Sequence, residues 1–274
     1  MKVFHICTIT NNLKQYEEMK SSYISAGFTE DRCRYSLFDN SKGNVFDPSV
    51  FNEIRLSTPE PYIIFCHQDI LLNQGDGYDR LIKVVDELNQ IDKAWAVAGN
   101  AGVSRKGEYV LRITDPFSES YPEWKKGFPY PVESLDENFL LIRTQADISC
   151  NIKTFYFYAH ELCLDALTKG FSSYVIDFHL THLSPGKYDH DGHSYFSSAI
   201  KAFENKWSQK FFFRYYKPMY AQTMCFSKYY FLRKLGKVGI YAKRIRIQAN
   251  DFVKKNFPLW EESFEFRYLN KNLI

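Results

Sequence analysis

The feature that most restricts the fold of this chain is a regular alternation of strand-like and helix-like segments over its first hundred residues. Apolar runs typical of buried strands occupy residues 3–9, 34–38, 61–66 and 94–99. Helical periodicity fills the intervals between them. Because parallel strands need a crossover connection, usually a helix, this order predicts an α/β fold with a mostly parallel sheet flanked by helices.

Polar side chains follow three of these predicted strands. They occupy residues 8–12, 39–44 and 67–69. In open α/β sheets, ligands bind in the crevice outside the carboxyl ends of the strands. We therefore expect a binding site at this edge of the sheet.

The third strand runs directly into His67, Gln68 and Asp69. A carboxylate at the mouth of a buried strand is costly to desolvate unless a cation or a hydrogen-bond donor compensates it. A divalent ion such as Mg²⁺ or Mn²⁺, held by few protein ligands and by substrate phosphates, would compensate it. A turn capped by Asp69 explains the residue equally well, so the segment alone leaves both interpretations open.

Histidines are concentrated in one segment. Four of the seven lie within residues 179–193, a density typical of metal ligands. Alternation along a strand places His182 on the face opposite His179, so the four histidines cannot all bind one ion. For any single histidine of this group, a surface or hydrogen-bonded imidazole is the commoner explanation.

Two further groups of polar residues are candidates for chemistry. Glu161 begins a predicted short helix, where the helix dipole favours a carboxylate; beside a metal and a sugar hydroxyl it could act as a general base. Asp136 and Glu137 precede a predicted strand at residues 139–142. They could bind saccharide hydroxyls or simply form a turn.

Motifs of several other enzyme classes are absent from the sequence. It contains no GxxxxGK[ST] P-loop, no GxGxxG after a strand and no GxSxG nucleophile elbow. The sequence therefore argues against a P-loop nucleotide hydrolase, a Rossmann dinucleotide enzyme and an α/β-hydrolase.

The C-terminal part of the chain has a different charge from the rest. Residues 201–255 hold 14 Lys and Arg residues against two acidic ones, and they are rich in aromatic residues. Helices of this composition could lie on an anionic membrane surface, or pack on the catalytic domain or on a second subunit of an oligomer. No motif for nucleic acid is present, so we expect no nucleic-acid partner.

We accordingly divide the chain into a domain of residues 1–207 and a basic, aromatic, helical region of residues 208–274. No stretch approaches 18 consecutive apolar residues, and the first nine residues lack the features of a signal peptide. The six cysteines form no CxxC pair, which favours a reducing compartment. We expect a cytoplasmic protein whose basic region could attach it to the inner membrane face.

Taken in order, these features resemble the nucleotide-sugar glycosyltransferases of the GT-A fold, family 2-like. That family opens with a strand and a Thr-rich turn, similar to residues 7–12. Its second strand ends in a "DNS" turn, matched by residues 39–41. Its third ends in an acidic metal motif similar to His67-Gln68-Asp69, in which a histidine replaces the first acid.

Two later matches extend the resemblance, which spans about residues 1–207. The family's Tyr-Gly-Glu-Asp-x-Asp-Leu run aligns with residues 158–164 and puts the catalytic base of inverting members on Glu161. A later histidine that completes the metal shell resembles His182. The resemblance thus implies a divalent ion, Mn²⁺ or Mg²⁺, held by Asp69 and His182.

The resemblance also implies a nucleoside-diphosphate sugar as donor, and a saccharide or lipid-linked molecule as acceptor. The expected activity is inverting hexosyl transfer, in a setting such as bacterial surface polysaccharide synthesis. We expect the donor to contact Thr8, Thr10, Asp39, Asn40 and His67, and the acceptor to contact Asp136 and Glu137.

Two other function classes stay open. A metal-dependent hydrolase would use the histidines of residues 179–193, but it would need a second carboxylate-rich metal motif that the sequence lacks. A non-catalytic module that binds a glycan or a nucleotide on the same fold is supported by His67 in place of the first acid.

Overall fold

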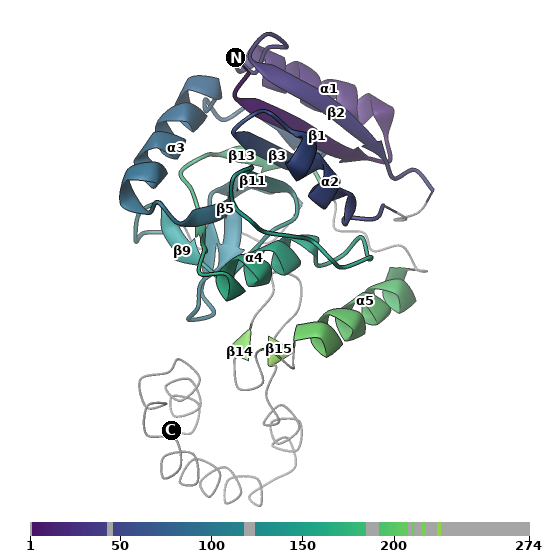
Figure 1. Ribbon diagram of the computed structural model, residues 1–274. Helices are drawn as coiled ribbons and strands as arrows, with labels where there is room; N and C mark the ends of the chain where they lie inside the picture. The colour runs from purple at the N-terminus through teal and green to yellow at the C-terminus, as the bar shows by residue number, and fades with distance from the viewer. Residues whose placement is uncertain are drawn as a thin grey trace, which may run out of the picture.

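The computed structural model describes residues 2–42, 46–117, 124–184, 192–207, 210, 215–216 and 224–225. At its centre is a seven-stranded sheet with the strand order β2-β1-β3-β11-β5-β12-β9 (Figure 1). Its strands are β1 (Phe4–Thr10), β2 (Cys33–Asp39), β3 (Tyr62–His67), β5 (Trp95–Gly99), β9 (Tyr130–Val132), β11 (Phe139–Arg143) and β12 (Ser172–Val175).

The central sheet is mostly parallel. β1 pairs in parallel with both β2 and β3, and β12 pairs in parallel with β5. β11 runs antiparallel between β3 and β5, and β9 runs antiparallel to β12. The predicted α/β class, with a mostly parallel sheet flanked by helices, is confirmed. The reversal of β11 has a physical reason: an irregular connection rather than a helical crossover leads into it.

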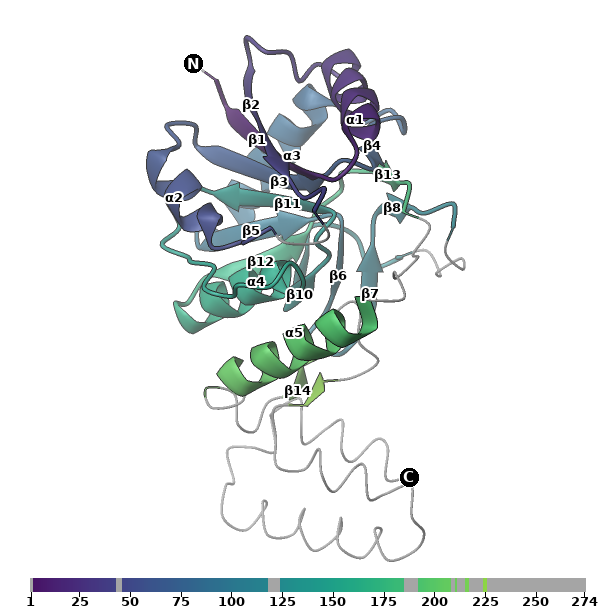
Figure 2. The same ribbon diagram turned by 90° about the vertical axis from the view of Figure 1, so that its right-hand side faces the viewer.

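Helices cover both faces of this sheet (Figures 1 and 2). Apolar side chains of α1 and α3 pack on one face, and those of α2, α4 and α5 pack on the other. The three layers bury two contiguous clusters of apolar side chains, which fix the sheet between them. The helices are α1 (Leu13–Ser25), α2 (Val50–Ser57), α3 (Tyr78–Ile91), α4 (Tyr158–Thr168) and α5 (Gly192–Trp207).

Short strands form the remaining described structure. β4 (Ile70–Leu71), β13 (Leu180–His182) and β8 (Ile113–Thr114) make one small sheet, and β10 (Ser134–Leu135), β6 (Ala101–Val103) and β7 (Tyr109–Leu111) make another. The stretch between β6 and β11 thus contributes short strands to three sheets, because β7, β8 and β9 each belong to a different one.

The C-terminal region is described only at its start. α5 ends at the predicted domain boundary, and β14 (Tyr215–Tyr216) pairs with β15 (Met224–Cys225) beyond it. The predicted helices of residues 208–274 otherwise lie outside the described residues, so this division stays a prediction. Within the described part, the helices are too short or too polar to cross a bilayer.

Candidate metal and donor site

The carboxyl ends of three neighbouring parallel strands meet at one edge of the sheet. The register pairs Thr10 with Asp39 and Ile9 with His67, so β1, β2 and β3 end side by side. Antiparallel β11 begins at the same edge, where the carbonyl of Asn138 accepts a hydrogen bond from the backbone N–H of His67 at 3.0 Å. The segments singled out in the sequence after these strands and before β11 therefore converge on this edge.

A small ladder brings His182 beside Asp69. β13 pairs antiparallel with β4, so that His182 lies opposite Ile70. The backbone N–H of Leu183 donates to the carbonyl of Asp69 at 2.7 Å. Two residues far apart in the sequence are thus held together by backbone pairing.

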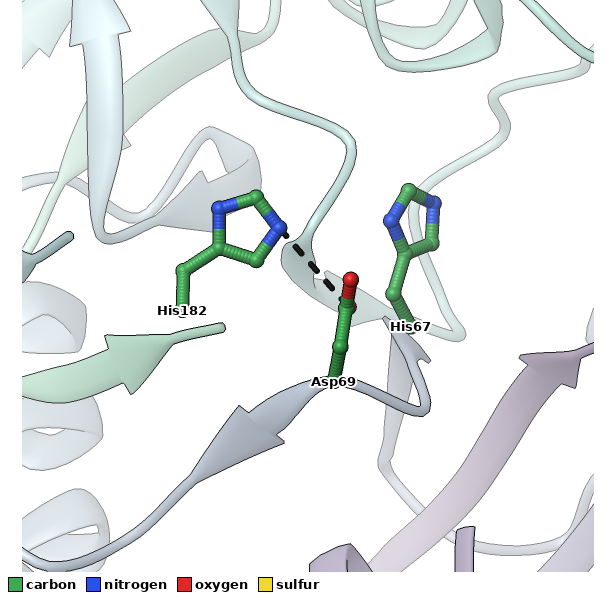
Figure 3. Close-up of side chains that lie close together, drawn as sticks. All are labelled: His67, Asp69 and His182. Carbon is green, nitrogen blue, oxygen red and sulfur yellow. Dashed lines mark ion pairs between the residues drawn. The ribbon is translucent and has the colours of Figure 1, made fainter. Parts of the chain in front are cut away.

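His67, Asp69 and His182 form a compact cluster at this edge (Figure 3). One potential ligand atom from each residue lies within 4.8 Å of the others. The Nε2 atom of His182 is 3.7 Å from Oδ1 of Asp69, and both side chains are largely buried. Oδ1 of Asp69 accepts no hydrogen bond from the described part of the chain.

This donor set fits a divalent metal ion. An unsatisfied, buried carboxylate oxygen is expensive unless a cation binds it. Two imidazole nitrogens and one carboxylate suit first-row transition ions such as Mn²⁺ better than Mg²⁺, which prefers oxygen ligands. His67 was expected to contact the donor, and its position in the cluster adds a possible third ligand. In the sequence, the spacing of two residues between His67 and Asp69 is the feature that could have indicated this role.

Asp115 lies behind the cluster and was not predicted. Its Oδ2 atom is 3.8 Å from Nδ1 of His182, the ring nitrogen that faces away from Asp69. Carboxylates in this position orient a histidine whose other nitrogen binds a metal. Asp115 therefore completes an acid–histidine–acid arrangement through His182.

His67 has its own polar partner on α4. Its Nε2 atom is 2.9 Å from the hydroxyl oxygen of Tyr158, and that hydroxyl donates to the carbonyl of Glu137 at 2.9 Å. The imidazole also stacks on Phe155, with ring centroids 5.9 Å apart. Burial lowers the pKa of His67, which favours the neutral ring that can bind a metal.

The first two residues of the "DNS" turn differ in exposure: the acid Asp39 is exposed, whereas the amide Asn40 is buried. Asp39 is exposed, and the backbone N–H of Ser41 donates to its Oδ1 at 2.8 Å. Hydrogen bonds from Ser41 lower the pKa of Asp39, so its carboxylate stays charged. Asn40 is buried and accepts a hydrogen bond from the N–H of Phe46 at 3.0 Å. Asp39 can reach a ligand, whereas Asn40 shapes the turn.

The two threonines of β1 point into the protein. Thr8 is fully buried, with its hydroxyl 3.5 Å from the sulfur of Cys66. The hydroxyl of Thr10 is buried too, and it hydrogen-bonds the backbone of Asn12 at 3.1 Å. Side-chain contact of either threonine with a donor is therefore not supported by these positions.

The two predicted acceptor residues differ in exposure. Asp136 is half-buried, and its Oδ1 accepts from the backbone and the side-chain amide of Asn138 at 2.9 and 2.7 Å. Glu137 is buried, and the backbone N–H groups of residues 157–159 hydrogen-bond its carboxylate at the start of α4. Burial raises the pKa of Glu137 despite these bonds. Acceptor contact stays a prediction for Asp136, while the contacts of Glu137 are those of a helix cap.

Glu161 is engaged by α5 rather than by the cluster. Its side chain is almost fully buried, and its Oε2 accepts from the indole N–H of Trp207 at 2.6 Å. The backbone N–H of Asn151 donates to Oε1 at 3.1 Å, and the ammonium of Lys206 contacts the same oxygen. None of these contacts joins Glu161, the base implied by the resemblance, to Asp69 or His182, and they favour an anchoring role.

The other histidines of the histidine-rich segment do not join the cluster in the described residues. The ring of His179 hydrogen-bonds the hydroxyl of Thr114 at 2.9 Å, and its backbone N–H donates to Asp76 at 2.6 Å. Burial lowers the pKa of His179. His190 and the side chain of His193 lie outside the described residues.

Fold and site together define an α/β protein with a candidate divalent-metal centre at the carboxyl edge of its sheet. No family model matches the sequence. The protein described as "ATP synthase subunits region ORF 6" of Fuscovulum blasticum is 32% identical over 200 residues, which cover 70% of this chain and 79% of that protein. The chain belongs to the same family as this ORF 6 protein.

Three solved structures align with much of this chain, each at a TM-score below 0.5. The GalNAc-T7 structure with UDP, GalNAc and Mn²⁺ has a TM-score of 0.49 at 6% identity and matches 77% of this chain. The mannosyltransferase PcManGT of Pyrobaculum calidifontis, in complex with GDP-Man and Mn²⁺, has a TM-score of 0.47 at 8% identity and matches 97% of this chain and 84% of its own. TarS of S. aureus has a TM-score of 0.43 at 12% identity and matches 75% of this chain. This chain spans 50% of the GalNAc-T7 chain and 65% of the TarS chain.

Proposed function

We propose that this protein is a glycosyltransferase that moves a sugar from a nucleoside-diphosphate sugar to a saccharide or lipid-linked acceptor. The observation that carries the proposal is the cluster of His67, Asp69 and His182 at the carboxyl edge of the sheet, close to the end of β2 at Asp39. A divalent ion on this cluster would neutralise the donor diphosphate as it leaves.

The protein's own residues would position the donor. Asp39 is exposed and ionised at the end of β2, so its carboxylate can accept hydrogen bonds from a ribose or a base. The buried amide of Asn40 holds the turn that presents it. Such positioning contributes much of the rate when a donor and an acceptor must react in one step.

The reaction would be a single inverting displacement. The acceptor oxygen forms a bond to the anomeric carbon while the bond from that carbon to the diphosphate oxygen breaks, and the leaving diphosphate keeps the electron pair. The acceptor proton passes to a carboxylate. The resemblance assigns this role to Glu161. Asp136 is the alternative, because it lies at the carboxyl edge of the sheet and close to His67, two residues before Asn138, whose carbonyl accepts from the N–H of His67.

Calorimetric titration of the full chain with UDP, GDP and CDP, each with and without Mn²⁺ or Mg²⁺, tests the proposal. We expect one nucleotide to bind only with metal, more tightly with Mn²⁺ because two imidazoles are among the ligands. Asp69→Asn should abolish metal-dependent binding. Asp79→Asn is the matched control, because Asp79 is 94% exposed and pairs with Arg32 instead. Absence of binding by all three nucleotides would contradict the proposal.

A non-catalytic binding module is the second candidate. It is favoured by the engagement of Glu161 with Trp207 and Lys206, which leaves the expected base without an open carboxylate oxygen. Release of nucleoside diphosphate from a panel of nucleotide sugars separates the candidates. Acceptor-dependent release indicates a transferase, release without acceptor a hydrolase, and tight binding without release a module.

The proposal extends to the setting of the reaction. The basic, aromatic residues 201–255 would attach the protein to an anionic inner membrane face, where lipid-linked acceptors of surface polysaccharide synthesis are found. Flotation with liposomes tests this step. Binding to vesicles with anionic lipid, and not to neutral vesicles, is expected; equal recovery with both would contradict attachment through charge.

A further inference from the structure

The side of His67 that faces away from the cluster is tied to the protein by a short chain of hydrogen bonds. This chain runs from Nε2 of His67 to the hydroxyl of Tyr158, and from that hydroxyl to the carbonyl oxygen of Glu137, each step being 2.9 Å.

The direction of these hydrogen bonds follows from their chemistry. A backbone carbonyl can only accept, so Tyr158 must donate its single proton to Glu137. The same hydroxyl has no second proton for His67 and must accept one from it. Nε2 of His67 therefore carries the N–H. In a neutral imidazole, Nδ1 then holds a lone pair.

The lone pair is directed into the cluster. In Figure 3, one ring nitrogen of His67 faces Asp69 and the other points away. Since Nε2 is the nitrogen bound to Tyr158, Nδ1 is the one that faces the cluster. A histidine that binds a metal usually donates its other N–H to a fixed acceptor, which sets its tautomer and orientation.

The acceptor is itself held firmly. Tyr158 is 1% exposed, and its ring packs edge-on against Phe65 with centroids 5.8 Å apart. It begins α4, whose first N–H groups bind the carboxylate of the same Glu137 that supplies the carbonyl. Glu137 thus binds the start of α4 with its carboxylate and accepts the hydroxyl proton of Tyr158 with its backbone carbonyl.

We propose that Tyr158 is a positioning residue that holds His67 in the Nε2–H tautomer, so that Nδ1 serves as a metal ligand beside Asp69 and His182. The inference rests on the metal site of the proposed function but not on glycosyl transfer. It gives His67 a role as ligand in place of the donor contact expected from the sequence.

The tautomer can be tested without metal. Long-range ¹H–¹⁵N spectra of the histidine-labelled full chain, with His67 assigned by its loss in His67→Gln, report which nitrogen is protonated. We expect the Nε2–H form in the wild type and a mixture of forms in Tyr158→Phe. A wild-type protein with the proton on Nδ1 would overturn the inference, whether or not the tyrosine variant folds.

Metal affinity provides the second test, with Mn²⁺ alone as the probe. Loss of the acceptor should weaken Mn²⁺ binding about 10- to 100-fold in Tyr158→Phe. Tyr35→Phe is the matched control, because the hydroxyl of Tyr35 also donates to a backbone carbonyl, that of Phe28, outside the cluster. This control should bind Mn²⁺ like the wild type.

A double variant separates a positioning role from general destabilisation. If Tyr158 acts through His67, adding Tyr158→Phe to His67→Gln should cause no further loss of Mn²⁺ affinity. Equal Mn²⁺ affinity of wild type and Tyr158→Phe, or additive losses in the double variant, would overturn the inference. Mn²⁺ binding that follows the expected pattern in a protein without transferase activity would instead refute the proposed function and leave the role of Tyr158 in place.

Discussion

Replacing Glu161 by Gln separates the two roles that sequence and structure give this residue. The substitution keeps the shape and one carbonyl oxygen but removes the charge that Trp207 and Lys206 contact. A general base would lose its function with its charge. An anchor of α5 would lose stability instead.

The size of the effect follows from the contacts. Hydrogen bonds to a charged group contribute about 1.5–3 kcal/mol. Lys206 is 32% exposed and can turn to solvent, so its share is screened and small. The bond from Trp207 is buried and dominates. We expect Glu161→Gln to lower the free energy of unfolding by about 2 kcal/mol, which for a domain of this size is a fall in Tm of about 4–8 °C.

Thermal unfolding and single-turnover transfer, measured on the same samples, distinguish the roles. Trp207→Phe is the matched variant, because it removes the other half of the same hydrogen bond without touching a carboxylate. If Glu161 is an anchor, both variants lose similar stability and the double variant loses little more than either alone. Unchanged Tm in Glu161→Gln with transfer abolished, and normal transfer in Trp207→Phe, would refute the anchoring role and restore Glu161 as the base.

Two further predictions concern the surroundings of the site. Asp115→Asn should weaken Mn²⁺ binding about 10-fold in a titration, because Asp115 faces the outer nitrogen of His182; unchanged affinity would remove Asp115 from the site. Burial lowers the pKa of His160 to about 3. Below pH 6.5 the imidazole of His160 is therefore protonated in the unfolded chain but stays neutral in the folded chain. Wild-type stability should therefore fall relative to His160→Gln as the pH drops from 6.5 towards 3, by up to about 1.4 kcal/mol per pH unit in denaturant titrations. Parallel stability curves for the two proteins would contradict this assignment.

The sequence predicted the site edge because the relevant information is local. Strand periodicity ends where polar residues begin, and parallel strands separated by helices must end together. The direction of β11 was not predictable, since apolar periodicity identifies a strand and not its partner. The burial of Thr8 could have been predicted from alternation, because Thr8 shares a strand face with Phe4 and Ile6, which lie in the core.

The orientation of Glu161 depended on long-range packing. Nothing within α4 indicates that Trp207 and Lys206, at the end of α5, will reach its carboxylate. His67 illustrates the opposite case. Its spacing of two residues from Asp69 is compatible with both side chains binding one ion, but the resemblance to the family motif predicted a contact with the donor instead. The tautomer that makes it a ligand depends on Tyr158 and Glu137, which become neighbours only in the fold.

α4 connects the metal cluster to α5. Its first turn holds His67 through Tyr158, and Glu161, one turn further along, holds α5. The first turn also packs on α5, since the ring centroids of Phe157 and Phe203 lie 5.2 Å apart. Its backbone hydrogen bonds, however, go to the carboxylate of Glu137, so loosening α5 should disturb the cluster less than removing the Tyr158 hydroxyl does. Mn²⁺ affinity should therefore fall less in Glu161→Gln than in Tyr158→Phe, although Glu161→Gln should lower Tm more. A larger loss of Mn²⁺ affinity in Glu161→Gln than in Tyr158→Phe would show that α5, and not the Glu137 cap, keeps Tyr158 in place.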